Sequence, residues 1–260
     1  MALYEHFRKE ERPFVEQASE WKEQVETRYE SKLTDFLDPR EQDILRSIIG
    51  NDEVVKLEFF GGPQGSERKR ALLFPFYEAP EQDQFHIRIY ELDYPVKFVS
   101  VGHRDVLGSM LGLGVKREKF GDIILQAQRI QIAVAEEIAS FVEMNFTKVA
   151  SASIQLHSVS LEEAIPVREE WEEVSTTVSS LRLDVLLAEM FRLSRSKVVP
   201  YIDGKRVKVN WRIADQPSFL VNEGDYLSVR GLGRRKLLTV EGKSKKDKWR
   251  VSYGKKQDPS

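Results

Sequence analysis

The sequence predicts an α+β protein, and two observations support that class. Stretches with helical periodicity alternate with short runs rich in β-branched and aromatic residues along all 260 residues. The charge divides the chain: residues 181–260 hold 19 Lys and Arg against 9 Asp and Glu, a net of +10, whereas residues 1–180 hold 21 against 33, a net of −12. The predicted segments are an N-terminal α+β domain (1–82), a middle α+β domain (83–164), an acidic linker (165–180) and a C-terminal domain with a basic tail (181–260).

The composition excludes several classes of protein. A hydrophobic content of 41% and a charged content of 32% are typical of a folded, water-soluble chain. The absence of cysteine excludes disulfides, thiolate zinc sites and cysteine nucleophiles. The four histidines have no metal-ligand spacing, and no apolar run is long enough for a signal peptide or a membrane span. We expect a cytoplasmic protein with no metal, no cofactor and no membrane insertion.

The first segment predicts helices followed by a hairpin. Apolar residues recur at helical spacing between Phe14 and Tyr29. In "DPREQDILRSIIG", Asp38 is a candidate N-cap, Glu41 completes a capping box and Gly50 follows as the C-terminal stop. Two β-rich runs, "EVVKLEFF" and "RKRALLFPFY", then flank the loop "GGPQGSE", which predicts a β-hairpin.

The middle segment predicts a two-layer sandwich that approximates the order βαββαβ. The predicted strands are "FHIRIYEL", "VKFVSV", "DIILQ", "RIQIAV" and "SIQLHSV", and the predicted helices are "HRDVLGSMLGLG" and "AEEIASFVEMNF". The order is similar to that of the RNA recognition motif (RRM), but the aromatic residues that stack bases in that fold are missing from "DIILQ". This RRM-like domain is therefore interpreted as a scaffold, or as a protein- or RNA-contacting face of unknown specificity.

The C-terminal segment predicts two helices and several strands. "LRLDVLLAEMF" places Leu183, Leu186, Leu187 and Met190 on one face, and Ser194 is a candidate N-cap for a second helix, "RSKVVPYI", that ends at Asp203-Gly204. "RVKVNW", "DYLSVRG" and "KLLTVEG" follow as strands.

Cations gather on these C-terminal elements. Arg195 and Lys197 lie in the first turn of the second helix, where cations are unfavourable for the helix dipole but free amides favour a phosphate. The outward face of "RVKVNW" adds Arg206 and Lys208, and the predicted glycine-rich loop "RGLGRRK" adds Arg230, Arg234, Arg235 and Lys236. About six phosphate contacts would give a slope of log affinity against log salt of about −4 to −5. Trp211, next to the strand, is a candidate either for base stacking or for packing.

The stretch "LRLDVLLAEMFRLSRSKVVPYIDGKRVKVN" resembles the alpha-L RNA-binding motif, the module named after small-subunit ribosomal protein four. The shared pattern is an Arg-Leu-Asp helix, Ser-Arg-Ser, a lysine-bearing helix, Gly, and Val-x-Val-Asn. Pro200 departs from it and is expected to bend or shorten the second helix. The resemblance implies recognition of structured RNA by Arg182, Arg192, Ser194, Arg195, Lys197, Lys205, Arg206, Lys208 and Asn210.

Over essentially its full length, the chain resembles the YlmH family of bacteria. The acidic helical N-terminus, "HRDVLGSMLGLGVKREKFGDI" and "RGLGRRKLLTVEGKSKKDKWRV" carry this similarity. The resemblance implies a non-catalytic protein of ribosome-associated quality control that binds the large ribosomal subunit, with ribosomal RNA and peptidyl-tRNA as partners. The encoding of such proteins near cell-division genes in Gram-positive bacteria adds division proteins as further partners.

Two alternatives remain open. "LRLD" also occurs, in altered form, near the catalytic aspartate of pseudouridine synthases, many of which carry an alpha-L module, so an RNA-modifying enzyme is one alternative. Here Asp184 falls inside the first helix of the module itself, and we expect it to orient Arg182 or to cap the helix. The other alternative is a division-linked interaction protein in which RNA binding is secondary.

Overall fold

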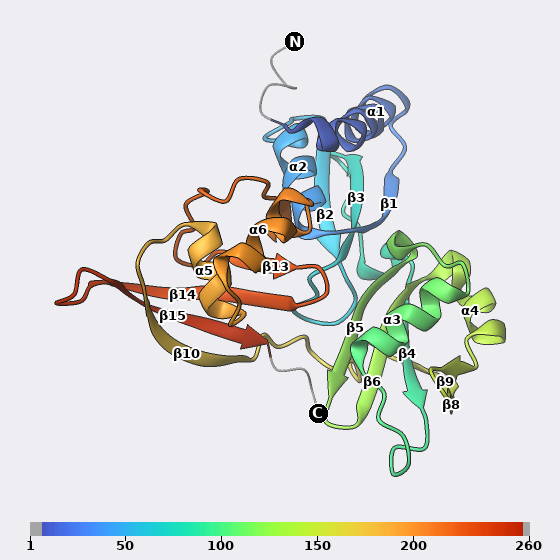
Figure 1. The fold of residues 1–260 in the computed structure, drawn as a ribbon. Coiled ribbons are helices and arrows are strands. Elements are labelled where there is room, and N and C mark those ends of the chain that lie inside the picture. Colours follow the sequence, from blue (N-terminus) through green and yellow to red (C-terminus); the bar gives the residue numbers. More distant parts are fainter. Residues whose placement is uncertain (1–6, 257–260) are drawn as a thin grey trace. The chain divides into compact units, whose positions relative to one another are not determined.

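The structure is a computed structural model that describes residues 7–256, and the chain forms two compact units (Figure 1). The first unit ends at Arg168 and the second begins at Glu169. Each has a hydrophobic core of its own. The mixture of helices and strands in both units confirms the predicted α+β class. None of the helices within residues 7–256 has the length and apolar character needed to cross a bilayer.

The first unit combines the segments predicted as the N-terminal and middle domains. It contains a three-stranded sheet of order β1-β3-β2, a four-stranded sheet of order β5-β6-β4-β9 and the small pair β7-β8. Its elements are η2 (Lys9–Glu11), α1 (Arg12–Arg28), β1 (Lys32–Leu37), α2 (Pro39–Ile49), β2 (Val55–Phe60), β3 (Lys69–Pro75), η3 (Gln82–Phe85), β4 (Ile87–Asp93), α3 (His103–Gly112), η4 (Arg117–Lys119), β5 (Phe120–Gln126), β6 (Arg129–Ala135), η5 (Glu136–Ile138), α4 (Ala139–Asn145), β7 (Lys148–Val149), β8 (Ala152–Ser153) and β9 (Gln155–Val159).

The predicted start and stop of α2 are confirmed. The Asp38 carboxylate accepts a hydrogen bond from the Glu41 amide at 2.9 Å, and the Glu41 carboxylate accepts one from the Asp38 amide at 2.7 Å. Gly50 follows the helix with a φ of 55°. The predicted hairpin is also confirmed, because β2 and β3 pair as antiparallel strands from Val55 with Pro75 to Phe60 with Arg70.

The middle segment has the predicted βαββαβ order, formed by β4, α3, β5, β6, α4 and β9, with β4 and β6 in the centre of an antiparallel sheet. The predicted strand "VKFVSV", residues 96–101, is wrong. This stretch follows Pro95 in a turn, where the amides of Phe98 and Val99 both donate to the Pro95 carbonyl. The Phe98 side chain is 88% exposed, so its aromatic character does not reflect burial in a sheet.

One face of this four-stranded sheet is covered by helices, and the other is covered in part. Helices α3 and α4 pack on one face (Figure 1). On the opposite face, Phe36 from β1 packs against Ala133 and Ala135 of β6. The fully buried Gln131 accepts a hydrogen bond from the Ile165 amide at 2.7 Å, which holds the chain after β9 across the same face. The part of this face at Ala133 and Ala135 is therefore closed to base stacking, whereas Asp93, Arg129 and His157 at its other end are exposed.

This closure predicts a cost for adding one methyl group at Gly121. A Cβ atom there would lie 2.8 Å from Cε1 of Phe36 and 3.2 Å from the Cβ of Ala133. We expect Gly121→Ala to lower the free energy of unfolding by about 1–3 kcal/mol through overpacking. Gly108→Ala in α3 is the matched control, since nothing lies within 4 Å of its added Cβ and alanine is the better helix former. Equal stability of the two variants in denaturant melts would show that Phe36 does not close the face.

The second unit is a six-stranded sheet with two helices on one face (Figure 1). The strand order is β10-β15-β14-β13-β11-β12, with antiparallel pairing throughout. Its elements are β10 (Trp171–Val178), α5 (Leu183–Met190), α6 (Arg195–Asp203), β11 (Val207–Val209), β12 (Arg212–Ile213), β13 (Tyr226–Val229), β14 (Gly233–Lys243) and β15 (Trp249–Lys256).

Strand β10 corrects the predicted acidic linker, 165–180. Residues 171–178 pair with β15 along their whole length. Val174, Thr176 and Val178 face the core or are partly buried, and the residues between them are exposed. This period of two is the pattern of a half-buried strand, and the neighbouring glutamates obscured it in the sequence.

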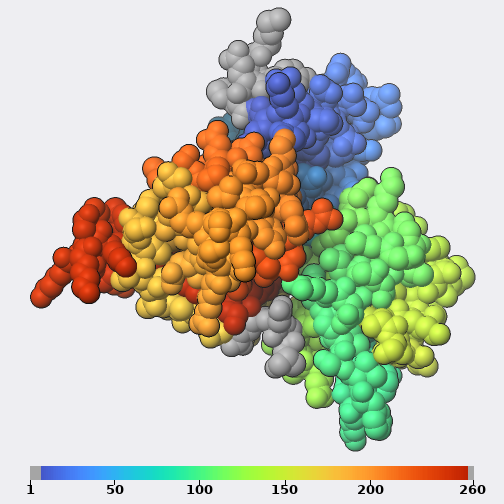
Figure 2. Space-filling view, in the orientation of Figure 1, coloured from blue at the N-terminus to red at the C-terminus, as the bar shows by residue number. Residues whose placement is uncertain are grey.

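The predicted basic tail is folded as far as residue 256, because β14 and β15 form a long hairpin. Its far end projects as a narrow arm, coloured red in Figure 2. The exposed lysines of that end are Lys243, Lys245, Lys246 and Lys248. The part of the predicted tail at 257–260 lies outside the described residues.

Candidate nucleic-acid interface

Helices α5 and α6 pack as the sequence predicts. Leu183, Leu186, Leu187 and Met190 of α5 are buried together with Val198 and Ile202 of α6. Helix α6 continues through Pro200 to Asp203, so the expected shortening does not occur. Proline removes only its own amide donor, and its carbonyl accepts from Gly204 at 3.1 Å at the end of the helix. A Cβ at Gly204 would lie 2.9 Å from that carbonyl oxygen, so glycine suits this close turn.

A buried carboxylate orients two arginines at this helix pair. Asp184, whose side chain is 2% exposed, accepts hydrogen bonds from Arg182 Nε and Nη2, each at 3.1 Å. Its Oδ2 atom also accepts from Arg195 Nη2 at 2.5 Å. Burial alone would raise the pKa of Asp184, but the hydrogen bonds and charges of the two arginines hold that pKa below its usual value. The side chain is therefore an anion that fixes the direction of both guanidinium groups, as expected for Arg182.

Ser194 is the N-cap residue of α6, as predicted, but its side chain makes no capping hydrogen bond. Ser194 has the extended backbone of an N-cap, and its carbonyl accepts from the amides of Lys197 and Val198. Its hydroxyl lies 2.9 Å from that of Ser196 and caps no amide. Arg195 and Lys197 are both exposed in this first turn. The positive end of the helix dipole and the positive charges of Arg195 and Lys197 thus lie together on the surface.

The strand after α6 alternates as predicted. Val207 and Val209 are buried, whereas Arg206 is exposed and Lys208 is partly exposed. The Arg206 guanidinium lies 4.6 Å from the centre of the Tyr201 ring and donates to the Arg230 carbonyl at 3.1 Å. Arg206 is therefore held beside α6 by stacking on an aromatic ring.

The stretch "RGLGRRK" is not a single loop, and its cations point to different sides of the sheet. Strand β14 begins at Gly233, so Arg230 lies in the loop and the other three cations lie on the strand. Arg235 faces the helices, with its guanidinium 4.5 Å from the Phe191 ring. Arg234 and Lys236 point to the opposite face, and the register places Lys208 in the same row as Arg234 across β13.

Three further predicted contacts lie at turns in the left-handed region of the backbone. Arg192 follows α5 and Lys205 follows α6, each with a φ of 53°, and both are exposed. Asn210, with a φ of 47°, donates from its amide to Asp225 at 2.7 Å and accepts from the Tyr226 amide at 2.9 Å. Its side chain therefore holds a turn, and RNA contact by Asn210 stays a prediction.

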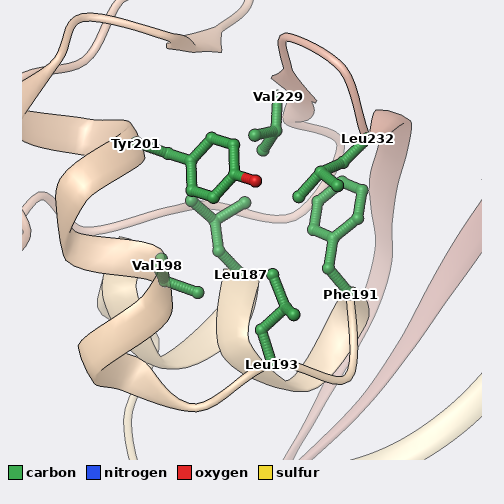
Figure 3. Close-up of a pocket in the computed structure, with 7 residues that line it drawn as sticks. All are labelled: Leu187, Phe191, Leu193, Val198, Tyr201, Val229 and Leu232. Carbon is green, nitrogen blue, oxygen red and sulfur yellow. The ribbon is translucent and has the colours of Figure 1, made fainter.

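An apolar pocket lies between α5, α6 and the end of β13 (Figure 3). Its lining consists of Leu187, Phe191, Leu193, Val198, Tyr201, Val229 and Leu232. Tyr201 supplies the polar oxygen in this view. Because the other lining side chains are hydrocarbon, the pocket has the character of core packing. Within residues 7–256, no group of three or more His, Asp or Glu side chains is placed to hold a metal ion.

Two features of the second unit were missed as functional candidates. Trp171 and Tyr226 pack near Trp211 on the face of the sheet opposite the helices, and the hairpin end carries exposed lysines. The alternation of "WEEVSTTV" was the available signal for the first, but the pairing of β10 with β15 cannot be read from local sequence.

Two parts of the chain match known protein families, and nearly the whole chain matches a known protein. Residues 181–226 match the S4 domain, the module that the alpha-L resemblance indicated, and residues 80–163 match the family described as "Putative RNA-binding domain in YlmH". A Bacillus subtilis protein named "Ribosome-associated protein quality control protein P2" is 47% identical over 251 residues, which cover 96% of this chain and 97% of that protein. The chain belongs to the YlmH family.

The family assignment confirms the resemblance stated from the sequence. A solved structure named "Cell division protein ylmH from Streptococcus pneumoniae" matches with a TM-score of 0.54 and 30% identity. The match covers 62% of this chain and 97% of the pneumococcal chain. Matches to an S4 domain and to a putative RNA-binding domain thus lie in one YlmH-family protein.

Proposed function

We propose that the chain is a non-catalytic RNA-binding factor of ribosome-associated quality control. It binds the large ribosomal subunit through ribosomal RNA and peptidyl-tRNA and acts on stalled translation in the cytoplasm. The name of the Bacillus subtilis relative supports a ribosome-associated role, and the S4 domain supports RNA contact. The observation that carries the proposal is the surface at the start of α6, where Asp184 directs Arg182 and Arg195 beside the exposed Lys197.

The charge distribution supports the same function. The S4 match and the +10 net charge lie in the same C-terminal part of the chain, whereas the rest is acidic. An acidic body disfavours non-specific contact with RNA, so binding is confined to one part of the molecule. We propose that Arg192, Lys205, Arg206 and Arg230 add phosphate contacts around α6.

The experiment is co-sedimentation of the full chain with purified large ribosomal subunits across a series of salt concentrations. We expect binding at low salt that falls with a log–log slope of about −4 to −5. Co-sedimentation that does not weaken with salt would contradict contact through phosphates. Failure to travel with the subunits at low salt would instead favour a division-linked interaction protein, as the name of the pneumococcal relative suggests.

A second measurement separates a binding factor from an RNA-modifying enzyme. The chain is incubated with ribosomal RNA and with tRNA, and the nucleosides are analysed by mass spectrometry for mass-shifted and isomerised bases. We expect no modified nucleoside, because Asp184 is committed to two arginines and the pocket beside α6 is apolar. Turnover would contradict the proposal.

A further inference from the structure

The turn between β11 and β12 contains a tryptophan, Trp211, at a position that favours glycine. It is a two-residue hairpin loop in which Asn210 and Trp211 have φ values of 47° and 63°. Such turns favour Asn-Gly, since both central residues need a positive φ. Asparagine tolerates that region, but a residue with a large side chain is disfavoured there. Backbone strain of this kind is typical of functional positions.

The turn is firmly held. The Asn210 side chain bonds to Asp225 and to the Tyr226 amide, and the Asn210 amide donates to the Tyr226 carbonyl at 2.9 Å. The indole of Trp211 is therefore fixed against β13, although a glycine at this position would relieve the backbone. Hairpin formation alone does not explain why tryptophan occupies the turn.

The indole belongs to a cluster of three rings, Trp171, Tyr226 and Trp211. The Tyr226 ring lies 5.2 Å from that of Trp211 and 6.1 Å from that of Trp171, between ring centres. All three side chains are partly exposed. Gly254 of β15 makes room for Trp171, because a Cβ there would lie 2.7 Å from the Trp171 Cβ.

Two cations lie over these rings. The Arg234 guanidinium is 5.1 Å from the centre of the Trp211 ring, and the Lys236 ammonium is 4.4 Å from that of Tyr226. One carboxylate, Glu169, accepts from the Tyr226 hydroxyl at 2.6 Å and lies 3.5 Å from Lys236. The hydrogen bond from Lys236 to the Tyr226 hydroxyl raises the pKa of the lysine, which stays charged at neutral pH.

The cluster lies on the face of the sheet away from α5 and α6. Leu227 and Val229 of β13 point into the core on the helix side, and Val229 also lines the pocket in Figure 3. Side chains alternate along a strand, so Tyr226 points to the other face, where Trp211 packs on it. Partly exposed aromatic rings with interleaved cations are the features with which proteins stack single-stranded nucleic acid.

We propose that Trp211 is the stacking ring of a site for an unpaired RNA nucleotide on this face, with Arg234 and Lys236 contacting the adjoining phosphates. The inference rests on the proposed RNA-binding function of the second unit and adds a contact separate from the surface at α6. The ligand class is single-stranded RNA of any sequence, because every base offers a face for stacking.

The test variant is Trp211→Gly in the full chain. Glycine suits the positive φ, which offsets part of the packing that the indole loses on Tyr226 and Arg234. A denaturant melt of the variant shows that it is folded, so that a loss of binding is not attributed to misfolding. We expect the affinity for fluorescein-labelled oligouridylate to fall by about 5- to 100-fold, with the affinity for a blunt-ended RNA hairpin unchanged. The salt slope should also stay the same, because no charge is removed.

Tryptophan fluorescence supplies a second readout. Quenching on addition of oligouridylate is expected in the wild type and should be reduced in Trp211→Gly. Trp21→Phe is the matched control, since Trp21 packs against the core of the first unit and against the Phe14 ring and should not report stacking. Wild-type oligouridylate affinity in Trp211→Gly would overturn the inference. If the wild type binds the hairpin but not oligouridylate, this site alone fails, whereas binding of neither RNA would overturn the proposed function as well.

Discussion

Replacing Arg195 and Lys197 together with alanine is expected to weaken binding to large ribosomal subunits by about 1–3 kcal/mol, or roughly 5- to 150-fold. Both side chains are exposed in the first turn of α6, and Asp184 holds Arg195 in a fixed direction. Because two phosphate contacts are lost, the log–log salt slope should flatten by about two units. Filter binding or co-sedimentation across a salt series measures both quantities.

The matched control is the double variant Arg28→Ala and Lys56→Ala. These two exposed cations lie on α1 and β2 of the acidic first unit, outside both family matches. The control changes the net charge by the same amount, so it separates local contact from the overall field. Equal salt slopes for the two double variants would show that the start of α6 does not contact RNA.

Elements with local signals were predicted accurately. The capping box of α2, the hairpin at "GGPQGSE" and the βαββαβ order each depend on periodicity or on residues within one turn of chain. Two of the errors arose where neighbours far away in sequence decide the structure. Residues 171–178 become β10 because β15 pairs with them, whereas residues 96–101 are apolar but have no strand beside them.

The cations of the site could be found from the sequence. The face of the sheet to which each of them points could not. The side to which Arg234, Arg235 and Lys236 point depends on the residue at which β14 begins, and that residue is set by the pairing of Gly233 with Val229. A shift of one residue would exchange the faces. The partly covered face of the sheet in the first unit was equally hidden, since its cover depends on Phe36 packing against Ala133.

Asp184 contacts two arginines, of which the sequence predicted only Arg182. Its contact with Arg182 is local, two residues apart, whereas its contact with Arg195 joins two helices across eleven positions. The net charge of the second unit therefore does not show that Asp184 orients two of its arginines. A buried anion lowers the formal charge by one but directs two guanidinium groups, and preorganised groups lose less entropy on binding.

Asp184→Asn is accordingly expected to lower both stability and affinity. The free energy of unfolding should fall by about 1–3 kcal/mol at neutral pH, less than for a fully buried pair, because Arg182 and Arg195 are 39% and 59% exposed and regain hydration. Affinity for large subunits should fall by about 3- to 10-fold, because Arg195 loses the group that orients it. Denaturant melts and filter binding measure the two effects.

The pH dependence of this loss identifies its cause. The pKa of Asp184 is lowered in the folded state, so its contribution is fully present above the unfolded-state pKa of about 3.9 and is lost as the pH falls through the folded value. The difference in stability between the wild type and Asp184→Asn should therefore shrink as the pH drops below about 4. Asp203→Asn, an exposed aspartate at the end of α6, is the control and should be at least as stable as the wild type at neutral pH, because it removes a negative charge from the negative end of the helix dipole. A stability difference for Asp184→Asn that does not change with pH would show that the ionised carboxylate is not what holds the two arginines.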